Sequence, residues 1–227
     1  MKNIICTGCS CTSGVYNDIN SSYLYSSILK NRLDARKYVV YNAGVSGCGL
    51  IHCINSFKNK SQEYLGKNPD ICILQLPEFL RQPQNADTRN VTDNYVTSYL
   101  NNKLNKMNLL EMCDKLIEED YNRLATFIEN NKEIGTETII ILYYYITYDI
   151  LNFASFFYDK YFNIVVKYLN ENNVKHTGIL KQSYFNKMGW TLSDGDIHPN
   201  AIGNDKICDI LIDLIENRKI NITKQCN

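Results

Sequence analysis

The sequence predicts an α/β protein in which a parallel β-sheet lies between two layers of helices. Five predicted strands, four of them short apolar runs, alternate along 227 residues with segments of helical periodicity. Glycine, proline and small polar residues follow the first three runs, as expected for loops at the carboxyl ends of parallel strands. This alternation favours a three-layer αβα arrangement. Neither an internal repeat nor a linker is visible, so residues 1–227 are predicted to form one domain.

The first four predicted strands are rich in Ile, Val, Leu, Cys or Tyr, and the fifth is short. The third is a nearly continuous apolar run that Pro77 ends, which is typical of a strand buried on both faces. The five predicted strands cover residues 4–6, 38–41, 71–76, 138–144 and 174–179.

Apolar residues at three- and four-residue spacing indicate the helices. These are expected at residues 20–32, 50–66, 109–131, 153–172 and 200–217. Phe156 and Ile202 are expected on the inward faces of the last two helices. The segment 84–106, rich in Asn, Asp and Thr, is predicted to be a long excursion over the functional edge of the sheet, with a short helix at 95–104. Residues 181–199 are predicted to be a loop.

Composition excludes several classes of function. The formal net charge is zero, so no general attraction to nucleic acid or to an acidic membrane is expected. No apolar segment approaches the roughly 20 residues that a membrane span needs. The amino terminus also lacks the pattern of a signal peptide. We therefore expect a cytoplasmic protein.

The nine cysteines are odd in number, and several lie within apolar runs. We interpret most of them as free thiols of a reducing compartment. The cluster of Cys6, Cys9 and Cys11 leaves a metal or iron–sulfur site open. However, alternate residues of a strand point to opposite faces, and no second Cys-x-x-Cys completes a tetrahedral set. No metal ion is therefore expected.

Two short motifs lie at opposite ends of the chain. Behind the first strand come Gly8, Ser10, Thr12 and Gly14 at alternate positions, which places a serine on a tight turn at the edge where α/β sheets bind ligands. Near the other end, His198 is followed by Pro and Asn and preceded by two acidic residues. His52 and His176 have no such context, and we expect them to be structural or exposed.

The first motif resembles the first block of the SGNH (GDSL-type) hydrolases, Gly-Asp-Ser-x-Thr-x-Gly, with Cys9 in place of the aspartate. The second motif resembles the last block of that family, Asp-x-x-His-Pro, although Gly195 stands where the acid is usual. The resemblance implies that Ser10 is the nucleophile and His198 the general base. It also implies that an acid orients the imidazole, for which we favour Asp196, with Asp194 as the substitute.

The same resemblance implies donors for an oxyanion. The spacing Asn-x-x-x-x-Gly that ends at Gly47 is similar to the second family block, which implies that the Gly47 N–H assists the Ser10 N–H. The third block, Gly-x-Asn-Asp, is missing, because the segment 76–79 reads Leu-Pro-Glu-Phe. Gln75 and Arg81 are the nearest substitutes, and an arginine there would stabilise an oxyanion or bind an anionic substrate.

The implied protein is a serine esterase on a flavodoxin-like, five-stranded parallel sheet. It would cleave a small acyl ester, most simply an acetyl group on a carbohydrate, and it would need no cofactor. The expected partner is a small-molecule or glycan ester, with no nucleic acid and no membrane. Three alternatives remain. They are an O-acyltransferase with the same triad, a non-catalytic binding module, which the missing third block favours, and a redox or metal role for the amino-terminal cysteines.

Overall fold

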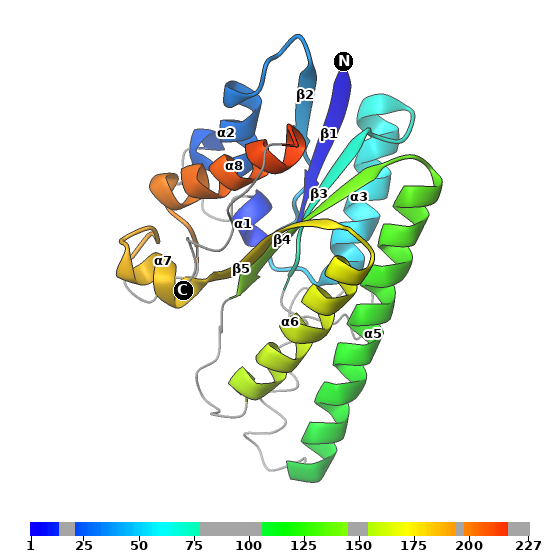
Figure 1. The fold of residues 1–227 in the computed structure, drawn as a ribbon, viewed down its shortest axis with the longest axis vertical. Helices are drawn as coiled ribbons and strands as arrows, with labels where there is room; N and C mark the ends of the chain where they lie inside the picture. The colour runs from blue at the N-terminus through cyan, green and yellow to red at the C-terminus, as the bar shows by residue number, and fades with distance from the viewer. Residues whose placement is uncertain (14–20, 78–105, 145–153, 194–197, 218–227) are drawn as a thin grey trace.

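A computed structural model describes residues 1–13, 21–77, 106–144, 154–193 and 198–217, and the structural statements below concern these residues. They form one five-stranded sheet in the order β2-β1-β3-β4-β5, with every neighbouring pair parallel (Figure 1). The strands are β1 (Lys2–Thr7), β2 (Tyr38–Asn42), β3 (Ile71–Gln75), β4 (Glu137–Tyr144) and β5 (Lys175–Lys181). The predicted parallel sheet of flavodoxin-like order is confirmed.

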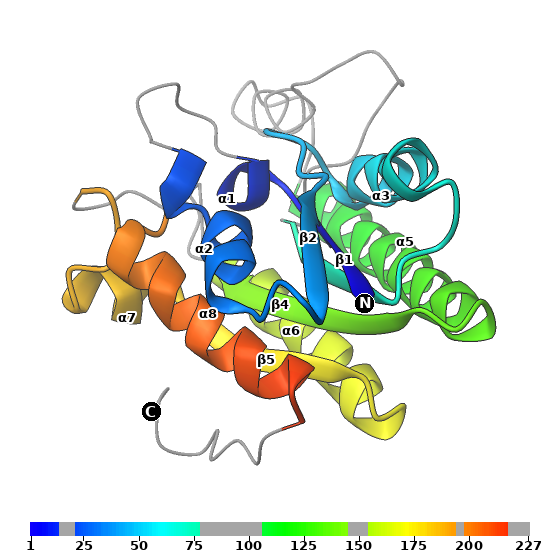
Figure 2. The same ribbon diagram turned by 90° about the horizontal axis from the view of Figure 1, so that it is seen from above.

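Helices cover both faces of the sheet, as Figures 1 and 2 show. Their bounds are α1 (Ser10–Ser13), α2 (Tyr25–Arg32), α3 (Leu50–Leu65), α5 (Lys106–Glu133), α6 (Ala154–Glu171), α7 (Gln182–Lys187) and α8 (Ala201–Ile215), with a 3₁₀ turn, η1, at Ser21–Tyr23. The helices α2, α7 and α8 pack on one face, and α3, α5 and α6 pack on the other. The three-layer prediction is therefore confirmed.

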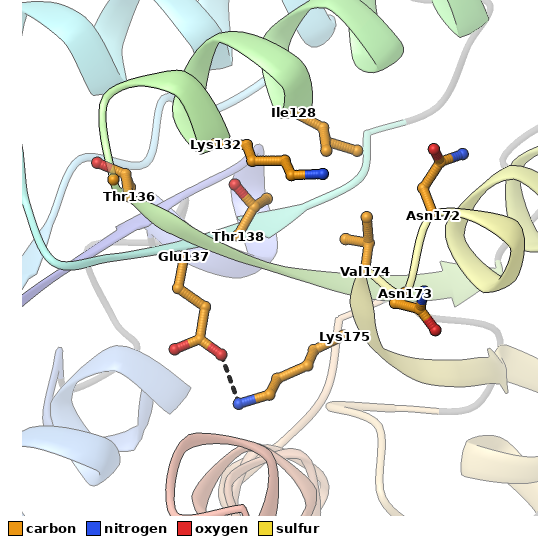
Figure 3. A pocket seen from close by; sticks show the side chains of 10 residues that line it. Ile128, Lys132, Thr136, Glu137, Thr138, Asn172, Asn173, Val174 and Lys175 are labelled. Carbon is orange, nitrogen blue, oxygen red and sulfur yellow. Dashed lines mark ion pairs between the residues drawn. The ribbon is translucent and has the colours of Figure 1, made fainter.

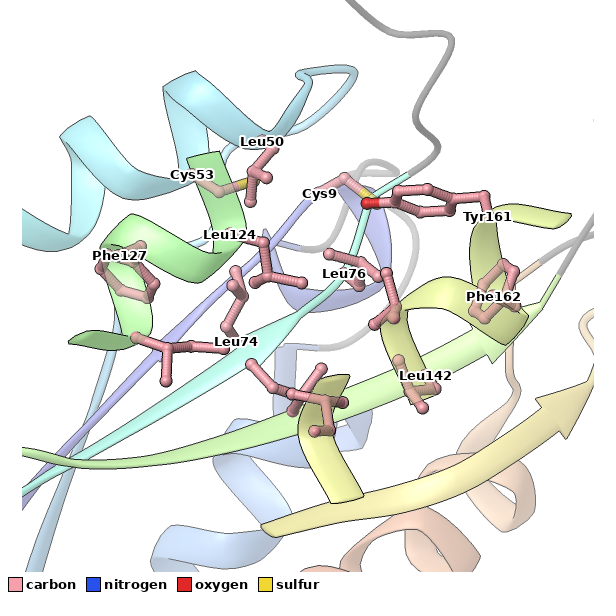
Figure 4. Packing of buried hydrophobic residues seen from close by; sticks show 14 of the residues in the cluster. Cys9, Leu50, Cys53, Leu74, Leu76, Leu124, Phe127, Leu142, Tyr161 and Phe162 are labelled. Atoms are coloured by element: carbon pink, nitrogen blue, oxygen red, sulfur yellow. The ribbon is translucent and has the colours of Figure 1, made fainter. Parts of the chain in front are cut away.

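Each strand supplies side chains to both layers in alternation, because successive residues of a strand point to opposite faces. In β1, Ile4 and Cys6 join the core under α2 and α8, whereas Ile5 joins the core under α3, α5 and α6. Figure 4 shows this second core, in which Cys9 lies at the carboxyl end of the sheet beside Tyr161. Burial on both faces explains why β3 and β4 appear in the sequence as nearly continuous apolar runs, whereas the edge strands β2 and β5 are only partly buried.

Two inward-facing predictions are wrong. Phe156 is 64% exposed and Ile202 is 56% exposed. Phe156 lies one position before the buried Phe157, and Ile202 lies one position before the buried Gly203. One step along a helix turns the side chain by about 100°, which is enough to take it off the buried side. Apolar character alone does not show on which side of a helix a residue near the end will fall.

Two local elements also differ from the sequence prediction. The helix expected at 20–32 is regular only over α2, because Leu24 before it is extended, with φ −66° and ψ 142°. The loop expected at 181–199 contains α7, whose six residues begin without a side-chain cap. Such a short helix gives little periodic signal. The segment 78–105, which holds the expected helix at 95–104, is outside the described residues.

The cysteines in the described part of the chain are all buried, and none forms a disulfide with another. No group of three or more His, Cys, Asp or Glu side chains within it could hold a metal ion. None of the helices described is both long and apolar enough to cross a lipid bilayer.

Candidate active site

Ser10 lies at the carboxyl end of β1, as the first residue of α1 (Figure 1). The Cys9 carbonyl accepts hydrogen bonds from the backbone N–H groups of Thr12 and Ser13, at 2.9 and 3.0 Å, and so closes this short helix. In the strand order 2-1-3-4-5, β1 and β3 are the neighbours at which the direction of winding reverses. Ligands of open α/β sheets bind at that point. Ser10 is therefore placed where this fold builds its sites.

Gly8 allows the turn between β1 and Ser10. A Cβ at this position would lie 2.7 Å from the Cβ of Gln75 and would also collide with the Thr12 hydroxyl. Real Cβ atoms do not come that close to another carbon, so only glycine lets the end of β1 approach β3 here.

His198 is held at the start of α8 by a cap and a short bridge. The Asn200 side chain accepts the Gly203 N–H at 3.0 Å, which caps α8. Its amide nitrogen donates to the carbonyls of Gly189 and Thr191, at 2.8 and 3.0 Å. The His198 carbonyl accepts the N–H of Leu192 at 3.1 Å. These contacts fix the backbone on both sides of the imidazole.

The first and the last motif of the sequence meet at this point. His198 Nε2 lies 2.9 Å from Ser10 Oγ, across 188 positions of sequence. Ser10 is only 5% exposed, and His198 is partly buried. This separation is within reach of a hydrogen bond between a hydroxyl and the base that would take its proton. Chemically, such a pair can activate an alcohol as a nucleophile.

Three of the predicted site residues cannot be placed. Asp194 and Asp196, the two candidate partners of His198, lie outside the described residues, and so does Arg81.

Gly47 lies in the loop between β2 and α3, and its φ of 68° is one that glycine adopts without strain. The loop is attached to the Ser10 turn, because the Val45 N–H donates to the Gly8 carbonyl at 2.9 Å. The Cys48 thiol donates in turn to the Val45 carbonyl at 2.8 Å. Gly47 is exposed between these two anchors, and its N–H as an oxyanion donor stays a prediction.

Gln75, the other predicted donor, is 1% exposed at the end of β3. Its carbonyl oxygen accepts the Thr12 hydroxyl at 2.9 Å, and its amide nitrogen lies 3.5 Å from the Cys9 sulfur. The side chain thus contacts the residues on both sides of Ser10. An oxyanion role for Gln75 also stays a prediction.

Sequence reasoning missed two residues that hold this turn. The Asn42 amide donates to the Thr12 carbonyl at 2.7 Å and accepts the Gly44 N–H at 2.8 Å, so it joins α1 to the loop after β2. The Tyr25 hydroxyl lies 3.0 Å from the Thr12 hydroxyl, and burial raises the pKa of this tyrosine well above its usual range. Asn42 was visible in the sequence only as a spacing marker before Gly47, and nothing signalled Tyr25.

A separate hollow of about 500 Å³ lies at the opposite end of the sheet (Figure 3). It is open and lined by the start of β4 and β5, where Glu137 and Lys175 form an ion pair. It lies at the amino ends of the strands, away from Ser10 at their carboxyl ends.

Comparison with known proteins gives a similarity of fold. No protein-family model matches the chain, and no curated protein sequence does. Among solved structures, a member of the lipolytic protein G-D-S-L family from Veillonella parvula DSM 2008 is similar, with a TM-score of 0.62 and 18% identity over 96% of this chain and 99% of that one.

Two other similar structures are esterases by their descriptions. The psychrotrophic esterase EstA from Pseudoalteromonas sp. has a TM-score of 0.62 and 12% identity, over 96% of this chain and 98% of that one. The acetylxylan esterase Axe2 from Geobacillus stearothermophilus has a TM-score of 0.55 and 16% identity, over 93% and 92%. The chain therefore has the fold of the SGNH (GDSL-type) hydrolases, as its first and last motifs implied.

Proposed function

We propose that this protein is a serine ester hydrolase of the SGNH type. The observation that carries the proposal is the 2.9 Å contact between Ser10 Oγ and His198 Nε2 at the carboxyl edge of the sheet. The fold supports it, because the similar structures include a lipolytic protein and two esterases. Fold alone does not specify an activity, so the weight rests on this pair of side chains.

The chemistry follows from the pair. Ser10 Oγ attacks the ester carbonyl while His198 Nε2 takes its proton, and the imidazolium then protonates the departing alcohol. Water, deprotonated by the same imidazole, cleaves the acyl-enzyme and releases the acid. Asp196, with Asp194 as the substitute, orients the ring and stabilises its charged form in this proposal.

The oxyanion of each tetrahedral intermediate needs donors aimed at it. We assign the Ser10 N–H, because the first N–H groups of a helix have no partner within that helix. The Gly47 N–H is the second donor, on a loop attached directly to Gly8. A small acyl group, most simply acetyl on a carbohydrate, is the proposed substrate. The similarity to an acetylxylan esterase supports this choice. Arg81 is the proposed substrate-binding residue, where its guanidinium would also stabilise the oxyanion.

The test is labelling with a fluorophosphonate probe, followed by peptide mapping, together with hydrolysis of a chromogenic acetate ester. We expect one adduct, on Ser10. The Ser10→Ala variant should lose both the adduct and at least about 1,000-fold in kcat. Ser13→Ala is the matched control, since it removes a hydroxyl from the same short helix.

Two outcomes would redirect the proposal. If Ser10→Ala hydrolyses the ester at the wild-type rate, the mechanism is wrong. If the wild-type protein takes up no probe, a non-catalytic binding module on this fold is favoured. An O-acyltransferase would be recognised by acylated glycan among the products when an acyl donor and a glycan acceptor are supplied together.

A further inference from the structure

The carboxamide of Gln75 lies directly behind the turn that presents Ser10. Gln75 closes β3, beside β1 at the point where the winding reverses, and its side chain is buried. Gly8 makes this closeness possible, because a side chain there would collide with the Gln75 Cβ. The amide is therefore packed against the inner side of the turn that carries Ser10.

The hydrogen bonds around this amide have a defined direction. The Gln75 carbonyl oxygen can only accept, so the Thr12 hydroxyl donates to it at 2.9 Å. Thr12 has one hydroxyl proton, so the Tyr25 hydroxyl, 3.0 Å away, donates to Thr12. The result is a buried chain from α2 through α1 to β3, and successive hydrogen bonds of this kind strengthen one another.

Cys9, the residue before Ser10, also contacts the Gln75 amide. Its sulfur lies 3.5 Å from the Gln75 amide nitrogen and 3.9 Å from Ser10 Oγ. Cys9 stands where the resembled family block has an aspartate, and it is fully buried beside Tyr161 (Figure 4). A thiol is a weak acceptor compared with a carboxylate, so more of the restraint on this turn falls to Thr12 and Gln75.

We infer that Gln75 is a positioning residue that acts through Thr12 and Cys9 to hold Ser10 Oγ in line with His198. The inference rests on the proposed hydrolase function. It assigns the buried amide to the geometry of the nucleophile and not to the oxyanion. A displacement of about 1 Å between reacting groups can cost on the order of 100-fold in rate, so a restraint on this turn matters for catalysis.

Two substitutions separate positioning from direct contact with the oxyanion. Gln75→Met keeps the length of the side chain and removes both polar groups. Thr12→Val keeps its shape and removes only the hydroxyl that joins α1 to Gln75. We expect each to lower kcat and the rate of Ser10 labelling by about 10- to 100-fold, with KM within about twofold. The double variant should lose little more than Gln75→Met alone, because both changes break one chain.

The controls use a matched pair at the other end of the sheet. There the buried Asn131 amide donates to the Thr138 hydroxyl at 3.0 Å, which is also a carboxamide–hydroxyl bond. Thr138→Val should lower the thermal midpoint about as much as Thr12→Val does, and leave kcat unchanged. Thr12→Ser keeps the hydroxyl and should retain near wild-type kcat, which separates loss of the hydrogen bond from loss of the fold.

The outcomes below would contradict the positioning role of Gln75 or the proposed function itself. If Gln75→Met loses activity while Thr12→Val does not, Gln75 acts on the oxyanion and the inference fails. If Thr12→Ser is as slow as Thr12→Val, the hydroxyl is not the link and the inference fails too. If Gln75→Met, Thr12→Val and the double variant all match wild-type kcat while Ser10→Ala is inactive, the inference fails and the hydrolase function stands without this network. A wild-type protein with no activity and no labelling would instead refute the proposed function itself.

Discussion

The two ends of the sheet use similar hydrogen bonds for different purposes. At the amino ends of the strands, each polar pair joins two neighbouring segments of the chain. The Asp70 carboxylate accepts the Asn3 N–H at 2.7 Å, the Asn131 amide donates to Thr138, and Glu137 pairs with Lys175 (Figure 3). These pairs join strands and helices to one another, and Lys175 Nζ also donates to the Leu214 carbonyl at 2.8 Å and to the Asn217 side chain at 2.6 Å.

At the carboxyl end, the polar contacts converge on one short helix. The Asn42 amide donates to the carbonyl of Thr12 in α1. The side chains of Gln75 and Tyr25 contact the Thr12 hydroxyl. His198, which is 188 positions away in the sequence, contacts Ser10, the first residue of the same helix. The comparison teaches that buried polar groups become a candidate site when they hold a reactive side chain at the edge where the strands end.

The largest expected difference lies between two histidines, one at each end. His198→Ala should lower kcat for a chromogenic acetate ester by at least about 1,000-fold, because it removes the proposed base. His176→Gln at the start of β5 should leave kcat unchanged. Steady-state kinetics on both variants provide the measurement. Equal losses of kcat in the two variants would show that the two ends of the sheet do not differ in their role in catalysis.

A smaller difference is expected between two glycines. Gly8→Ala forces a Cβ into Gln75 and should lower the free energy of unfolding by about 2–3 kcal/mol. It should also reduce kcat, since the turn that carries Ser10 must shift. Gly135→Ala, at a φ of 76° with open space around it, should cost about 1 kcal/mol and leave kcat intact.

Denaturant titration and ester hydrolysis measure the two effects of the glycine substitutions. If Gly8→Ala keeps full stability and rate, the close approach of β1 to β3 is not what shapes the site.

The smallest expected effect is a dependence of stability on pH at the amino end. Burial lowers the pKa of His176 below its ordinary value of 6.5. Its ring is held neutral, because Nδ1 accepts the Gly178 N–H at 3.1 Å and Nε2 then donates to Asn170 at 3.1 Å. As the pH falls below 6.5, the unfolded chain binds a proton that the folded chain resists, so stability is lost toward acid and retained above 6.5.

Thermal unfolding of the wild type and of His176→Gln, at about pH 7.5 and about pH 5.5, measures this effect. We expect a smaller drop in the midpoint for the variant. An identical drop in both proteins would show that His176 does not contribute to the dependence.

The predicted fold agrees with the structure where the sequence signal is local and strong. The run from Ile71 to Gln75 is apolar throughout and forms β3, and Gly66 ends α3 in the left-handed conformation with a φ of 59°. Errors occur where the outcome depends on neighbours. Phe156 and Ile202 are as apolar as the buried residues beside them, and only the angular position on the helix decides their exposure.

The candidate site shows the same difference between local sequence signals and contacts that depend on distant neighbours. The sequence indicated Ser10 and His198 as a possible pair, because each lies in a short motif with its own spacing. It could not show that Gln75 contacts Thr12 or that Tyr25 does, since these residues are 63 and 13 positions from Thr12 and belong to no motif. Side-chain hydrogen bonds between separate elements leave no periodic trace along a chain.

The sequence by itself determined the order of strands and helices and the placement of a serine behind β1 and a histidine before α8. Local propensity and hydrophobic periodicity suffice for that, because each acts over a few residues. Only the tertiary structure decided that the two side chains touch across 188 positions, and that Gln75 lies behind the turn between them. Packing of the helices on the two faces brings the ends of separate strands to one edge, and contacts made there depend on the whole sheet.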